Sequence, residues 1–143
     1  MRSRSKRMRG QSTVEMAIIL PTVALLLVVV GDFARVFYAA IGVASAARAG
    51  VQYGSQNYAT AVEYTNIQQA ALNDGKNISG LSATASDFCM CGGQTVSCNP
   101  PQCTQPQTYV KVTATATFTP ILKYPGLPSS IPLSSTAIME VQQ

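Results

Sequence analysis

An apolar segment dominates the N-terminal third of the chain. From Met16 to Gly31 the sequence MAIILPTVALLLVVVG holds no charged residue, and an alanine-rich stretch follows Asp32 and Arg35. At about 1.5 Å per residue the uncharged part falls just short of a hydrocarbon core about 30 Å thick. The pattern therefore predicts one long helix from about Thr13 to Gly50, with its first half in the membrane. Asp32 and Arg35 lie three positions apart, on one face, where they can form an ion pair.

The remaining sequence switches between helical and strand periodicity. Residues 58–73 space their apolar side chains by three or four, which predicts a second, short helix. Residues 108–118 alternate apolar side chains with polar ones that are mostly threonine, which predicts a half-solvated strand. Further strands are expected at 79–88 and 133–141, separated from the others by proline-rich or cysteine-rich loops. The expected fold class is α+β: a long N-terminal transmembrane helix, a second short helix and a small antiparallel sheet of about three strands with a Cys-rich loop.

Basic residues gather before the apolar segment. Five of the ten Lys and Arg residues occupy the first nine positions: Arg2, Arg4, Lys6, Arg7 and Arg9. Beyond Gly10 the remaining basic and acidic residues nearly cancel, so no basic face is left for a nucleic acid. The positive-inside rule then predicts a single-pass membrane protein, with a cytoplasmic N-terminus and a C-terminal domain outside the cytoplasm. A secretory signal cleaved near Ala47 is a weaker alternative, because the alanine-rich stretch continues in helical register.

The side chains that usually perform catalysis are sparse. The chain has no histidine, the commonest general base and metal ligand. Its six acidic residues are scattered, and it lacks a nucleophile motif such as GxSxG. We therefore expect neither enzymatic activity nor a metal or other cofactor. The competing hypothesis, a membrane-tethered enzyme, would require a convergent polar site.

The four cysteines lie within one short loop rich in Gly and Pro, at positions Cys89, Cys91, Cys98 and Cys103. Outside the cytoplasm an even number of cysteines in such a loop favours two disulfides. A direct bond between Cys89 and Cys91 would be strained. Two arrangements remain open: Cys89–Cys98 with Cys91–Cys103, or Cys89–Cys103 with Cys91–Cys98. A four-thiolate zinc site is the weaker alternative, because no CxxC pair is present.

The junction between leader and helix resembles the processing site of type IV prepilins, in which a basic leader ends in glycine and glutamate is the fifth mature residue. Cleavage after Gly10 would make Gln11 the first mature residue and Glu15 the fifth. The sequence is most similar to TadE-like pseudopilins of tight-adherence (Flp-type) pili. The matching motifs are Arg9-Gly10-Gln11, Val14-Glu15, Leu20-Pro21, Phe33, Arg35-Val36-Phe37-Tyr38 and Ala46-Ala47-Arg48-Ala49-Gly50. Met16 departs from the family, where an aromatic residue commonly follows the glutamate.

The resemblance implies three regions: a basic prepilin-type leader at 1–10, a transmembrane and assembly helix at 11–52, and a small extracytoplasmic domain at 53–143. It also implies a structural subunit, a minor pilin or pseudopilin, processed at Gly10 and Gln11 by a prepilin peptidase. The implied partners are that peptidase, other pilin subunits, the inner-membrane assembly platform and the lipid bilayer. The implied location is the bacterial inner membrane, with the C-terminal domain periplasmic, or extracellular once the subunit is in a pilus. Glu15 would pair with the new N-terminal amine of its own or a neighbouring chain, neutralising two charges that are costly to bury singly.

Two questions stay open at the level of sequence. An envelope adhesion or scaffolding module that never polymerises shares every feature except processing, and a main filament subunit is a further, weaker alternative. The small residues Gly42, Ala46 and Gly50 recur every four positions, which suits close helix–helix packing between subunits. The same spacing equally suits packing under the chain's own domain.

Overall fold

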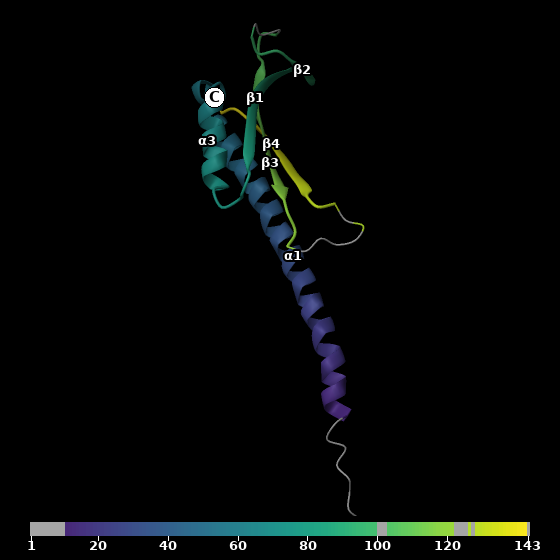
Figure 1. The fold of residues 1–143 in the computed structure, drawn as a ribbon. Helices are drawn as coiled ribbons and strands as arrows, with labels where there is room; N and C mark the ends of the chain where they lie inside the picture. The colour runs from purple at the N-terminus through teal and green to yellow at the C-terminus, as the bar shows by residue number, and fades with distance from the viewer. Residues whose placement is uncertain (1–10, 100–102, 122–125, 127, 143) are drawn as a thin grey trace, which may run out of the picture. The chain divides into compact units, whose positions relative to one another are not determined.

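The computed structural model describes residues 11–99, 103–121, 126 and 128–142. Three helices precede four strands (Figure 1): α1 (Gln11–Gly54), α2 (Tyr58–Ala61), α3 (Tyr64–Asp74), β1 (Ser82–Cys91), β2 (Gln94–Val96), β3 (Gln107–Phe118) and β4 (Ile131–Glu140). The chain divides into two compact units after Arg35, so α1 contributes to both. The predicted α+β class is confirmed.

The part of α1 that precedes Val36 belongs to the first unit. At about 1.5 Å per residue, Gln11–Arg35 has a length of about 37 Å, enough to cross a hydrocarbon core. Its large apolar side chains are exposed all round the helix, and Pro21 lies within it. A helix that is apolar on every face needs an apolar solvent or partner. Within the described residues, Ser12–Gly54 is a helix long and apolar enough to cross a membrane.

The second unit is built on one antiparallel sheet with strand order β2-β1-β3-β4. β1 pairs with β3 from Ser82↔Thr115 to Met90↔Gln107, and β3 pairs with β4 along most of its length. The short strand β2 pairs with the end of β1 across Gly92 and Gly93, whose φ values of 60° and 84° are left-handed. Such a tight turn needs glycine, and β2 is the strand that the sequence pattern does not predict.

One face of the sheet forms the core of this unit. The buried side chains of β3 are Val110, Val112, Ala114, Ala116 and Phe118, in agreement with the predicted alternation. They pack against α3 and against the portion of α1 that follows Val36, through Val43, Ala46, Ala47, Val51, Ile67 and Ala71. The opposite face presents serine and threonine hydroxyls in register across three strands. Ser82 Oγ lies 2.8 Å from Thr115 Oγ1, and Thr113 Oγ1 lies 2.9 Å from Thr136 Oγ1.

The prediction of a single helix at 58–73 is wrong in one respect, because this segment forms two helices, α2 and α3. Asn57 begins α2 with a capping box, in which its side chain accepts from the Thr60 N–H and Thr60 Oγ1 accepts from the Asn57 N–H. Thr60 Oγ1 is thereby held in the first turn; α2 ends at Ala61, and Val62 is its C-cap. The chain restarts as α3 from Glu63, whose carbonyl oxygen accepts from the Ile67 N–H.

The last strand begins earlier than the proline pattern predicts. Pro132 lies inside β4, opposite Thr117. The Val141 N–H donates to the Thr108 carbonyl, 2.8 Å away, and hydrogen-bonded pairs alternate along an antiparallel ladder. Pro132 therefore occupies a position whose backbone nitrogen faces away from β3, at the open edge. Proline is tolerated there because no ladder hydrogen bond is lost.

Candidate functional site

The N-terminal end of α1 holds the residues assigned to processing and assembly. Gln11 is the first residue of the helix, and Gly10 lies outside the described residues. The Glu15 side chain is exposed, and within the described part of the chain it has no ion-pair or hydrogen-bond partner. Its neighbours Val14 and Met16 are also exposed. A carboxylate in this apolar setting gains most from a partner outside the chain.

The predicted ion pair on α1 is confirmed. Arg35 Nη1 donates to Asp32 Oδ1 at 3.0 Å, and the Asp32 side chain is almost fully buried. Pairing offsets the cost of removing this carboxylate from water. The pair follows the uncharged segment directly, at the end of the first unit.

The small residues of α1 face the domain of the same chain. Ala46 is fully buried, and a Cβ on Gly42 would lie 2.6 Å from Ile78 Cδ1. A Cβ on Gly50 would lie 3.1 Å from Ala71 Cβ and from Val112 Cγ1. The spacing was compatible with packing between subunits or under the chain's own domain, and in the structure these residues pack under the chain's own domain. Small residues allow α1 to approach α3 and the sheet closely.

The four cysteines form two disulfides at one end of the sheet. Cys89 bonds Cys98, and Cys91 bonds Cys103, with Cα–Cα distances of 5.1 and 6.1 Å. This is the first of the two arrangements that the sequence leaves open, and it replaces the zinc alternative. Both bonds tie the segment after β2 back onto β1, where chain entropy would otherwise oppose a fixed loop.

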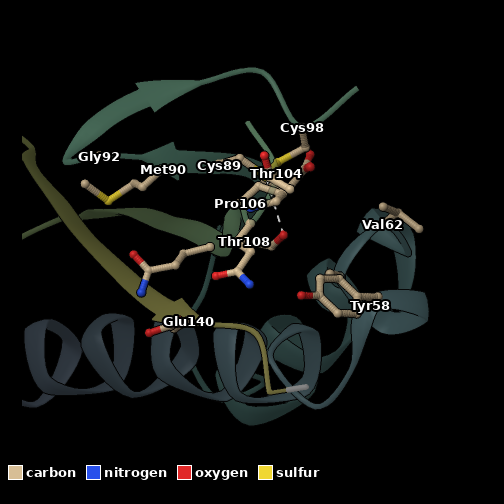
Figure 2. Close-up of a pocket in the computed structure, with 14 residues that line it drawn as sticks. Tyr58, Val62, Cys89, Met90, Gly92, Cys98, Thr104, Pro106, Thr108 and Glu140 are labelled. Atoms are coloured by element: carbon tan, nitrogen blue, oxygen red, sulfur yellow. Dashed lines mark hydrogen bonds between the residues drawn. A yellow bond between two sulfur atoms is a disulfide. The ribbon is translucent and has the colours of Figure 1, made fainter. Parts of the chain in front are cut away.

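A groove lies between this disulfide-bonded end and helix α2 (Figure 2). It has a volume of about 960 Å³. One wall is α2, with Tyr58 and Val62, and the other is the segment that includes Thr104 and Pro106. Cys89 and Thr108 lie at its base, where their side-chain Sγ and Oγ1 atoms are 3.4 Å apart.

Tyrosine hydroxyls donate to the two carboxylates that line the groove. The Tyr64 hydroxyl donates to Asp87 Oδ1, and the Tyr109 hydroxyl to Glu140 Oε2 at 3.5 Å. The hydrogen bond to Asp87, with some desolvation and the carboxylate charge, raises the pKa of Tyr64 above its ordinary value. Each carboxylate keeps oxygen lone pairs that can accept further hydrogen bonds.

No sequence motif signals this groove, because its walls come from α2, β1, β4 and the segment before β3. Tyr58, Asp87 and Glu140 are far apart in sequence and share no periodic pattern. Among the residues that the structure describes, no three His, Cys, Asp or Glu side chains gather in a way that could hold a metal ion.

Comparison with known proteins identifies the N-terminal region. Residues 10–52 match the family described as TadE-like protein. No curated protein and no solved structure matches the chain. The matched segment begins at Gly10 and covers most of α1, so it contains Gln11, Glu15 and the small residues that pack under the domain.

The long apolar helix and the α+β unit after it define a membrane-anchored, single-pass protein. The family match adds that its N-terminal region, residues 10–52, is TadE-like.

Proposed function

We propose that this chain is a minor pilin or pseudopilin of a Flp/Tad-type pilus, cleaved after Gly10 by a prepilin peptidase and assembled through its N-terminal helix. The observation that supports this most directly is the family match, which begins at Gly10. The five basic residues before it favour a cytoplasmic leader and a periplasmic domain. A prepilin peptidase and the inner-membrane assembly platform are the partners that this role requires.

Glu15 supports an assembly role by its position and its lack of a partner among the described residues. After cleavage, the amine of Gln11 would be the nearest new positive charge, four residues away on the helix. A carboxylate and an amine that meet between packed helices neutralise each other, whereas either group alone would be costly to bury. The length of the chain favours a minor subunit, because the unit after Arg35 makes up most of its residues.

Mass spectrometry of the mature chain, expressed with a prepilin peptidase, tests the processing step. We expect a mature N-terminus at Gln11, and an intact leader after Gly10→Asp. Assembly is tested by quantifying the subunit in sheared pili for Glu15→Ala. Thr13→Ala, an exposed neighbour on the same helix, is the matched control. Cleavage with full incorporation of Glu15→Ala would refute the role of the carboxylate and leave processing intact.

A second candidate is an envelope adhesion or scaffolding module that never polymerises. The packing of Gly42, Ala46 and Gly50 against the chain's own domain favours it, since that face of α1 is not available to a second helix. An intact leader in wild-type cells, with the protein confined to the membrane fraction, would support this module over the pilin.

A further inference from the structure

The groove between α2 and the disulfide-bonded end of the sheet is separate from the processing and assembly residues. All of its lining residues belong to the unit that follows Arg35, and none is on α1. Its volume of about 960 Å³ is at the upper end of the range for small-molecule sites, about 300–1,000 Å³. A site of this size can hold several linked rings, whereas a single small ion would leave most of it empty.

Hydrogen-bond donors and acceptors are mixed along the groove. The amides of Gln105 and Gln107 supply both kinds, and the Thr104 hydroxyl supplies both as well. Asp87 and Glu140 supply acceptors only. A ligand that meets this set must itself present donors and acceptors close together. Hydroxyl groups on a sugar ring do this, because each hydroxyl donates once and accepts twice.

Apolar surface is present on opposite walls. The Tyr58 ring stands on α2 with its hydroxyl directed into the groove, and Pro106 lies on the facing wall (Figure 2). Tyrosine offers a flat apolar face and a polar tip with little conformational entropy to lose on binding. The carbon-bound hydrogens of a sugar ring can contact such a face while its hydroxyls contact the amides.

Both walls are held in place before any ligand arrives. Tyr58 is the first residue of α2, directly after the capping box of Asn57. The facing wall follows Cys103, which is bonded to Cys91 on β1. A preorganised site lowers the entropic cost of binding.

We propose that this groove is a binding site for a neutral oligosaccharide. A cationic peptide is the competing ligand, since two carboxylates line the groove. Both carboxylates already accept a tyrosine hydroxyl, from Tyr64 and Tyr109. The hydroxyls of an oligosaccharide both donate and accept, which matches the mixed amides and hydroxyls beside the carboxylates, whereas the ammonium groups of a cationic peptide only donate. The oligosaccharide satisfies the whole set, and its binding requires neither cleavage nor polymerisation of the chain.

The test uses the full chain, labelled and kept in a detergent without a sugar headgroup, on a printed array of neutral and N-acetylated oligosaccharides with an oligolysine peptide spotted as the cationic probe. We expect binding to at least one neutral glycan, with an affinity about tenfold lower for Tyr58→Ala and Gln107→Ala. Tyr58→Phe keeps the ring and separates its contribution from that of the hydroxyl. Tyr38→Ala is the matched control, because Tyr38 is an exposed tyrosine on α1 away from the groove lining.

Tyr58 is 48% exposed, so its replacement leaves the core intact, and retention of the fold is checked by circular dichroism. Absence of binding to every neutral glycan would overturn the proposal. Equal binding by wild type, Tyr58→Ala and Gln107→Ala would also overturn it, by placing the glycan elsewhere on the surface. Selective binding of oligolysine would replace the oligosaccharide with a cationic ligand.

Discussion

Gly50 on α1 lies against Val112 on β3, so closely that a Cβ on Gly50 would be 3.1 Å from Val112 Cγ1. The same Cβ would lie 3.1 Å from the Ile67 carbonyl oxygen, on α3. Gly50 is therefore the point at which three elements of the domain meet. This contact explains why a helix with the composition of a membrane segment keeps small residues where it joins the sheet.

Replacing Gly50 with leucine should destabilise the domain. The larger side chain has no space between α3 and β3, and overpacking of this kind costs about 1–3 kcal/mol. Thermal unfolding of the full chain in detergent, followed by circular dichroism, measures the loss. Ser45→Leu is the control, because Ser45 is exposed on the same helix and should change stability by less than about 0.5 kcal/mol. Unchanged unfolding of Gly50→Leu together with lost pilus incorporation would instead assign Gly50 to contacts between subunits.

Exchanging valine and threonine at adjacent positions of β3 should destabilise the fold at one position and be nearly neutral at the other. Val112 is fully buried, so Val112→Thr places a hydroxyl in the core and should cost about 1–3 kcal/mol. Thr113 is on the hydroxyl-lined face, so Thr113→Val loses only the 2.9 Å contact with Thr136 and should be nearly neutral. Urea unfolding of both variants measures the difference. Equal effects would contradict the register of the sheet.

The two disulfides should differ in their contribution to stability although they close loops of similar size. Their sequence separations are 9 and 12, for which the chain-entropy model gives about 3 kcal/mol each. Cys89 is buried and Cys91 is only partly so. Cys89→Ala/Cys98→Ala should therefore be the more destabilising double variant, because it also leaves a cavity. Denaturant unfolding of both double variants under oxidising conditions measures the difference, and identical losses would show that loop closure alone matters.

Alkaline pH should weaken the contact between α3 and β1. The pKa of Tyr64 is raised in the folded protein by its hydrogen bond to Asp87, so the neutral phenol is favoured on folding. This contribution is fully present below the ordinary tyrosine pKa of 10.0 and is lost as the pH rises through the higher folded value. Tyr64→Phe should remove part of the fall in Tm above the ordinary tyrosine pKa of 10.0.

Tyr53 contributes separately to the same alkaline fall in Tm, because its hydroxyl donates to Glu63 and its pKa is also raised. Tyr53→Phe should remove a separate part of the alkaline fall, and the double variant should remove both. A Tm profile for Tyr64→Phe that is parallel to wild type across this range would contradict the prediction.

The periodic parts of the fold can be predicted from sequence because a local pattern determines them. The alternation along β3 places Val110 and Val112 on the apolar face, and both are buried in the core. The division of the second helix into α2 and α3 could not be predicted in this way, because the break after Ala61 has no signal in the hydrophobic period. The location of Pro132 inside β4 could not be predicted either, because the sequence does not show which strand lies at the edge of the sheet.

The sequence by itself determined the apolar helix, its flanking charges and the TadE-like junction at Gly10 and Glu15, since each depends on residues close together in the chain. Tertiary structure alone decided the cysteine pairing, because the two open arrangements differ only in how the loop folds back on β1. It also decided the role of Gly50, since a small residue suits packing against any surface that comes close. The groove at Tyr58 arises in the same way, from side chains that meet only when the sheet and helices pack together.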